Sequence, residues 1–102
     1  MAVRFLFSEA ADGVEAVRMV HEANEGAAPF DAVFMDNIMH VMHGPEAAQV
    51  MRAAGYRGLI VGVTGNVMEH DVRDYILHGA DYVMGKPVQV NELRKILEKI
   101  VV

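Results

Sequence analysis

The chain has 102 residues, a net charge of −5 and no cysteine. This length suits a single domain spanning residues 1–102, and the lack of cysteine excludes disulfide bonds and thiolate chemistry. The acidic balance without a basic run argues against direct nucleic-acid binding, and no apolar stretch reaches membrane-spanning length. We therefore expect a cytoplasmic protein with no nucleic-acid partner and no membrane segment.

Short apolar runs alternate with stretches of helical periodicity along the chain. The runs have the length and the β-branched or aromatic content of strands, and they occupy residues 2–7, 32–35, 59–63 and 82–84. The helical stretches lie between Asp12 and Gly26, from Gly44 to Gly55, from Asn66 to His78, and from about Asn91 to the end. Such alternation predicts an α/β fold with a parallel sheet.

The apolar positions also predict how these elements pack. The run at 32–35 is apolar throughout, which is typical of a strand buried on both faces. In the helical stretch that begins at Gly44, we expect Val50, Met51 and Ala54 to face the sheet. In the next helical stretch the apolar positions are Met68, Val72, Tyr75, Ile76 and Leu77.

Polar residues follow three of the apolar runs. Asp36, Thr64 and Lys86 come at or just after the carboxyl ends of the predicted strands, where ligands bind in open parallel sheets. A carboxylate at this edge can accept a phosphoryl group, while a lysine and a hydroxyl stabilise its oxygens. An alternative is open for Asp36 taken alone, because an Asp after a strand also starts turns or caps helices.

Three motifs carry these residues: DNIMHVMHG at 36–44, GVTGN at 62–66 and GADYVMGKP at 79–87. In order and spacing they resemble the receiver domains of two-component response regulators, above all receivers attached to hybrid histidine kinases. The resemblance implies a flavodoxin-like fold, with Asp36 as phosphoacceptor, Thr64 as switch hydroxyl and Lys86 as the lysine that contacts the phosphoryl group. It also implies a cis peptide bond before Pro87, and a histidine kinase or a phosphotransfer protein as partner.

The chain departs from the family pattern where the family binds metal. Receivers begin with a strand that ends in an acidic pair holding Mg²⁺, followed by a first helix, whereas this sequence starts at the counterpart of the second strand. His40 and His43 replace a proline and an aspartate of the family loop. We expect a truncated receiver fold with four parallel strands and about four helices, in which Mg²⁺ binding at Asp36 and phosphotransfer are weakened.

The missing strand also predicts a homodimer. That strand is central in the family, so its loss would expose backbone groups at strand edges and an apolar sheet face. A second copy would cover both. If the strand at 2–7 moves into the vacant position instead, Glu9 approaches Asp36 and partly replaces the acidic pair as a metal ligand.

Three functions are open from the sequence. The first is a phosphoacceptor module rather than an enzyme, and the second is a non-catalytic dimeric interaction scaffold that retains only the fold. The third is a small metal-dependent hydrolase, in which Asp36, His40 and His43 hold Zn²⁺ or another transition ion that activates water. For the two histidines we favour the alternative that they are loop positions that are no longer needed for phosphotransfer, because a metal site also needs supporting partners around its ligands.

Overall fold

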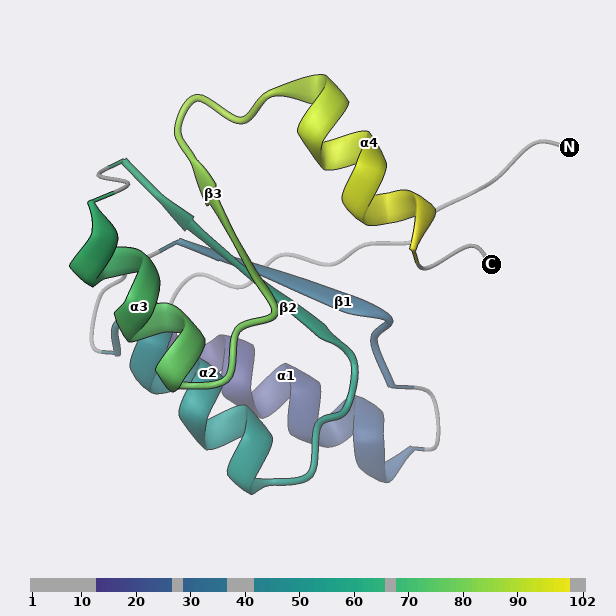
Figure 1. Ribbon diagram of the computed structural model, residues 1–102. Coiled ribbons are helices and arrows are strands. Elements are labelled where there is room, and N and C mark those ends of the chain that lie inside the picture. Colours follow the sequence, from purple (N-terminus) through teal and green to yellow (C-terminus); the bar gives the residue numbers. More distant parts are fainter. Residues whose placement is uncertain (1–12, 27–28, 37–41, 66–67, 100–102) are drawn as a thin grey trace, which may run out of the picture.

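A computed structural model describes residues 13–26, 29–36, 42–65 and 68–99. In these residues three parallel strands form one sheet in the order β1-β2-β3 (Figure 1). The strands are β1 (Ala32–Asp36), β2 (Leu59–Thr64) and β3 (Tyr82–Gly85). The helices are α1 (Gly13–Glu25), α2 (Gly44–Ala53), α3 (Glu69–Leu77) and α4 (Val90–Glu98). This alternation confirms the predicted α/β class; the strand predicted at 2–7 lies outside the described residues.

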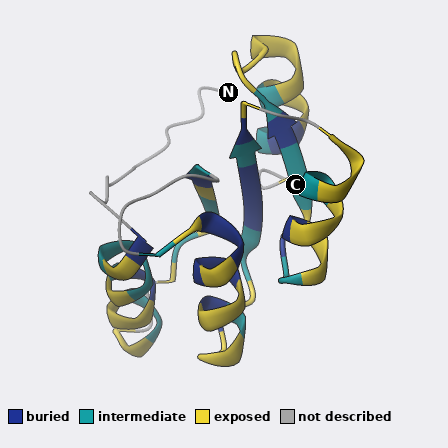
Figure 2. Cartoon of the chain, turned by 90° about the vertical axis from the view of Figure 1, so that its left-hand side faces the viewer, coloured by how far each residue is buried: buried dark blue, intermediate teal, exposed yellow. Residues whose placement is uncertain are grey.

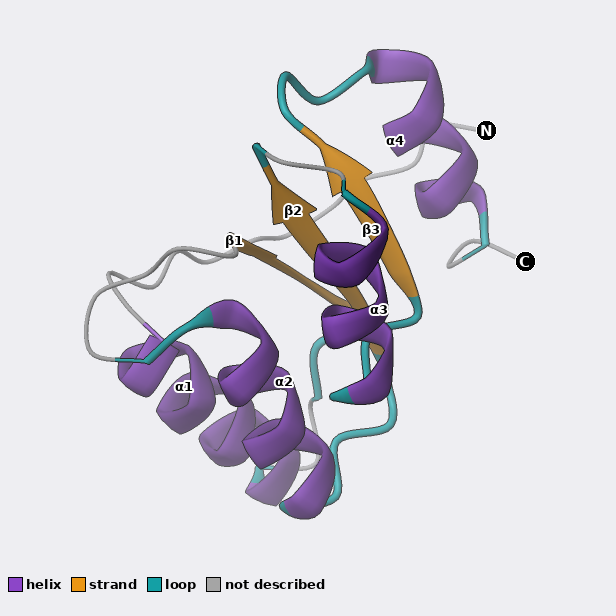
Figure 3. Ribbon diagram, turned by 60° about the vertical axis from the view of Figure 1, so that its left-hand side comes forward, coloured by secondary structure: helices purple, strands orange, loops and turns teal. Residues whose placement is uncertain are grey.

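The helices lie on both faces of the sheet. Helices α1, α2 and α3 are on one side and α4 is on the other (Figures 1 and 3). The central strand β2 is the most buried (Figure 2). No helix within the described ranges is long and apolar enough to cross a membrane.

Two clusters of buried side chains hold these layers together by removing apolar surface from water. The larger cluster, on the side of α1 to α3, contains Val20, Met35, Ala47, Ala48, Met51, Tyr56, Ile60, Tyr75 and Ala80. The smaller cluster joins α4 to the other face through Val61, Met84 and Ile96.

The buried face of α2 differs from the predicted one. Met51 is buried as expected, but Val50 is 36% exposed and Ala54 is also exposed. Ala47 and Ala48 are fully buried in their place. The prediction was wrong because it weighted the larger apolar residues, whereas the short alanines let α2 approach the sheet closely.

The apolar residues of helix α3 differ in burial. Tyr75 is completely buried, whereas Met68, Ile76 and Leu77 are 54%, 45% and 77% exposed. The buried residue of this helix is therefore a single aromatic side chain, which covers a large apolar area.

Strand β1 is not buried on both faces within the described part of the chain. Phe34 is 41% exposed, and it pairs with Val61 and so points to the same face of the sheet as that residue. Helix α4 covers Val61 and Met84, over β2 and β3. Phe34 lies one strand away from this cover, which is why the prediction from its apolar run was wrong.

Candidate functional site

The strand register brings the three predicted site residues to one edge of the sheet. Asp36 is the last residue of β1 and pairs with Val63, and Thr64 ends β2 beside Gly85. Lys86 follows Gly85 directly, and its backbone N–H donates to the carbonyl oxygen of Thr64 at 2.9 Å. The peptide bond between Lys86 and Pro87 is cis, as predicted.

Asp36 and Lys86 are in direct contact. Lys86 Nζ donates to Asp36 Oδ2 and forms an ion pair with it. The side chains of Lys86 and Asp36 are 46% and 41% exposed. A pair this open to water contributes at most about 1 kcal/mol to stability.

Thr64 differs from this pair in its burial. Its residue surface is 1% exposed, and it is the buried polar residue among those described. Asp36 therefore meets solvent at this edge, whereas Thr64 lies just beneath it.

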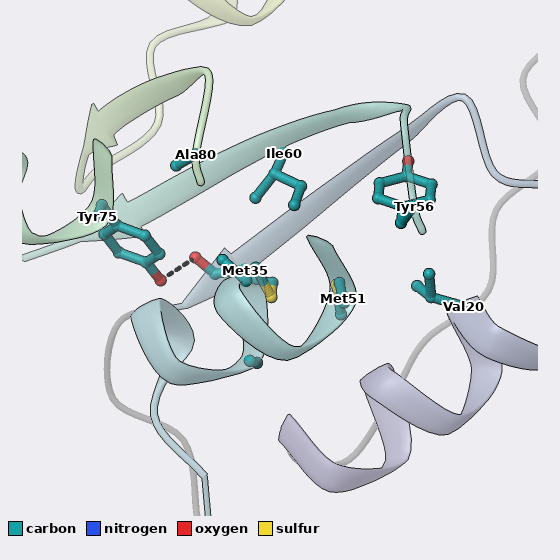
Figure 4. Packing of buried hydrophobic residues seen from close by; sticks show 9 residues of the cluster. Val20, Met35, Met51, Tyr56, Ile60, Tyr75 and Ala80 are labelled. Carbon is teal, nitrogen blue, oxygen red and sulfur yellow. Dashed lines mark hydrogen bonds between the residues drawn. The ribbon is translucent and has the colours of Figure 1, made fainter. Parts of the chain in front are cut away.

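A buried tyrosine supports this edge, and the sequence did not predict its role. The Tyr75 hydroxyl donates to the carbonyl oxygen of Met35 at 2.9 Å (Figure 4). Burial, and to a smaller degree the charge of Asp36, raises the pKa of the Tyr75 hydroxyl, so that it stays protonated and donates. The available signal was Gly62, because a glycine inside a strand often marks a close approach of another group.

Comparison with known families identifies the architecture. A family model described as the response regulator receiver domain matches residues 4–98. The chain belongs to this family. The family assignment made from the three motifs is thereby confirmed.

Relatives and solved structures agree with the receiver assignment. The chain is 41% identical to the two-component response regulator ORR41 of Oryza sativa subsp. japonica, over 89% of this chain and 69% of that protein. It is 37% identical to two-component system protein A of Emericella nidulans, over 86% of this chain and 12% of that protein. The chain thus spans only a small part of the second relative.

A solved receiver domain gives the structural counterpart. The receiver domain of the sensor histidine kinase PA1611 from Pseudomonas aeruginosa PAO1 superposes with a TM-score of 0.77 at 29% identity, covering 91% of this chain and 75% of that one. That structure holds a magnesium ion coordinated in the active site cleft. The receiver fold is therefore shared at the level of chain path as well as of motif.

The described residues of this receiver do not complete a comparable metal site. Magnesium takes oxygen ligands in near-octahedral geometry. Within the described ranges no group of three or more His, Cys, Asp or Glu side chains is placed to hold a metal ion, and the Asp36 carboxylate is paired with Lys86. The predicted ligand Glu9 lies outside these ranges.

The histidines give no support to the zinc alternative. His43 is exposed at the N-cap of α2 and makes no capping hydrogen bond with its side chain. His40 lies outside the described residues. The structure thus brings Asp36 and Lys86 together, with Thr64 at the same edge of the sheet. Tyr75 binds the backbone just before Asp36.

Proposed function

We propose that this receiver domain accepts a phosphoryl group on Asp36 from a phosphohistidine of a histidine kinase or a phosphotransfer protein. The observation that carries the proposal is the ion pair between Asp36 and Lys86 at the carboxyl edge of the sheet. In the proposed reaction the Asp36 carboxylate, which is partly open to solvent, is the nucleophile, and the Lys86 ammonium beside it meets the incoming phosphoryl oxygens.

The step is a displacement at phosphorus. An Asp36 carboxylate oxygen attacks, and a P–O bond forms as the P–N bond to the donor histidine breaks. The bonding electron pair leaves with the imidazole nitrogen, which a proton from solvent neutralises. Lys86 then pairs with the phosphoryl oxygens, and the Thr64 hydroxyl donates a hydrogen bond to one of them.

We propose further that Mg²⁺ binds this receiver weakly. Support comes from the described donors, among which Asp36 is already paired with a lysine. Titration calorimetry with Mg²⁺, run beside the PA1611 receiver as control, tests this: we expect a lower affinity for this chain. Equal affinities would refute the weakened site.

Phosphoramidate tests the phosphoacceptor directly, because its P–N bond is the same kind that a phosphohistidine offers. We expect acid-labile phosphate on the wild-type chain and none on Asp36→Asn. The matched control is Asp31→Asn, an exposed aspartate just before the same strand at the opposite edge, which should label normally. Absence of phosphate on the wild-type chain would overturn the proposal and favour the interaction scaffold.

The homodimer is retained as a proposal of its own. Phe34 offers exposed apolar surface on the face of the sheet where α4 packs, and a second copy would remove it from water. Sedimentation equilibrium of the wild-type chain and of Phe34→Glu tests this. We expect the wild-type chain to be a dimer and the charged variant to be a monomer; a wild-type monomer at all concentrations would contradict the proposal.

The cytoplasmic location stays a prediction.

A further inference from the structure

Tyr75 occupies a space that two glycines leave open for it. It is completely buried, and its ring lies against β2, where a Cβ on Gly62 would sit 2.6 Å from Tyr75 Cδ2. Its hydroxyl lies at the start of α2, where a Cβ on Gly44 would sit 1.8 Å from the hydroxyl oxygen. Since real Cβ atoms do not approach other atoms so closely, Tyr75 fits only because both positions are glycine.

The same side chain contacts the backbone next to the phosphoacceptor. The Tyr75 hydroxyl donates to the Met35 carbonyl (Figure 4), which belongs to the peptide group that joins Met35 to Asp36. The following carbonyl, that of Asp36, lies 2.5 Å from where a Cβ on Gly44 would be. Tyr75 thus binds the peptide group before Asp36, and the start of α2 lies close against the carbonyl after it.

We propose that Tyr75 is a positioning residue for phosphorylation, which fixes the backbone of Asp36 so that its carboxylate is held against Lys86. The inference rests on the proposed phosphoacceptor function of Asp36. Asp36 is the last residue of β1, where ladder pairing ends and the orientation of the peptide depends on other contacts. The hydroxyl of Tyr75 supplies such a contact from a helix 40 residues away in sequence.

A second buried tyrosine, which lies between α2 and β2, provides a matched control at the other end of β1. Tyr56 is 2% exposed, and its hydroxyl donates to the carbonyl of Phe30 at 2.9 Å, just before β1 begins. Tyr56→Phe and Tyr75→Phe each remove one buried hydroxyl that donates to a backbone carbonyl at 2.9 Å, and Tyr56→Phe also removes a longer contact of 3.4 Å to the Leu59 carbonyl. If Tyr75 serves stability alone, the two variants should behave alike.

The first measurement is the rate at which acid-labile phosphate forms from phosphoramidate. We expect Tyr75→Phe to slow phosphorylation by about tenfold, because small displacements of a reacting group lower rates steeply. Tyr56→Phe should stay within about twofold of the wild-type rate, since its hydrogen bond lies at the far end of the strand. Equal rates for the two variants would overturn the inference.

The second measurement does not depend on phosphorylation. The ¹³Cγ shift of Asp36 and the ¹⁵Nζ shift of Lys86 report their ion pair by NMR. We expect both shifts to move in Tyr75→Phe and to stay in place in Tyr56→Phe. If the wild-type chain takes no phosphate, the proposed function fails, and these shifts alone then decide the positioning role. Unchanged shifts in Tyr75→Phe would refute it.

Discussion

At the amino ends of β2 and β3 the side chain of Arg52 reaches several partners, whereas at the carboxyl edge an exposed ion pair joins Asp36 to Lys86. Arg52 donates to the carbonyls of Tyr56, Gly58 and Gly79 at 2.8–3.0 Å, and to Asp81 Oδ2 at 2.8 Å. Asp81 Oδ2 also accepts from the N–H of Ile60 at 2.9 Å. These bonds connect the segments that lead into both strands.

Buried tyrosines hold the backbone of β1 at both ends, through the Phe30 carbonyl and the Met35 carbonyl. The difference lies in the charged side chains. The Arg52 side chain is 26% exposed and donates to three carbonyls as well as to Asp81, whereas the Lys86 side chain is 46% exposed and pairs with Asp36. Arg52 therefore joins the segments that lead into β2 and β3, whereas the proposed function gives Asp36 and Lys86 a role in phosphoryl transfer.

The largest expected effect comes from breaking the amino end. Arg52→Ala should lower the free energy of unfolding by about 3–4 kcal/mol, because it leaves partly buried carbonyls without their donor and removes the cation that pairs with Asp81. Urea unfolding measures this. The control is Arg73→Ala, which removes an exposed pair with Glu69 and should cost about 0.5 kcal/mol. Equal losses for the two variants would mean that the Arg52 contacts add no more than a surface pair.

High pH should weaken the same end through Tyr56. Burial, as the main cause, raises the pKa of Tyr56 to about 12. In the unfolded chain a tyrosine loses its proton at about pH 10. Unfolding therefore becomes more favourable as the pH rises between these two values. The stability that the protonated Tyr56 contributes is fully present below about pH 10 and has been lost above about pH 12.

Tyr56→Phe removes this dependence. We expect its unfolding free energy to fall less than that of the wild-type chain between about pH 9 and about pH 11.5, by about 2 kcal/mol. Tyr75→Phe should act in the same direction, because the pKa of Tyr75 is also raised. Urea unfolding at both pH values checks this; parallel curves for all three chains would show that neither hydroxyl is kept protonated by the fold.

The sequence predicted the elements that local pattern controls. The apolar runs at 32–35, 59–63 and 82–84 became β1, β2 and β3 with ends shifted by one residue at most. Glycine also marked a helix end correctly, because Gly55 after α2 has φ of +99°, a conformation that few other residues adopt. The α/β class with a parallel sheet then followed from the alternation of strands and helices.

The sequence did not predict contacts that depend on how distant elements pack. The hydrogen bond from Tyr75 to Met35 joins residues 40 positions apart, and the Arg52 bond to Asp81 joins residues 29 apart. Neither leaves a periodic signal. The exposure of Phe34 also depends on how distant elements pack, because α4 packs on Val61 and Met84 of β2 and β3 rather than on β1.

The smallest effect should come from the carboxyl edge. Lys86→Ala removes the ion pair with Asp36, yet we expect it to change the unfolding free energy by less than about 1 kcal/mol, since both side chains are more than two-fifths exposed to water. The same variant should lose most of its acid-labile phosphate after phosphoramidate treatment, because the cation that meets the phosphoryl oxygens is gone. Lys95→Ala, an exposed lysine on α4, is the control and should change neither quantity. If Lys86→Ala lowers the unfolding free energy as much as Arg52→Ala does, the ion pair stabilises the fold. The two ends of the sheet would then not differ in their contribution to stability.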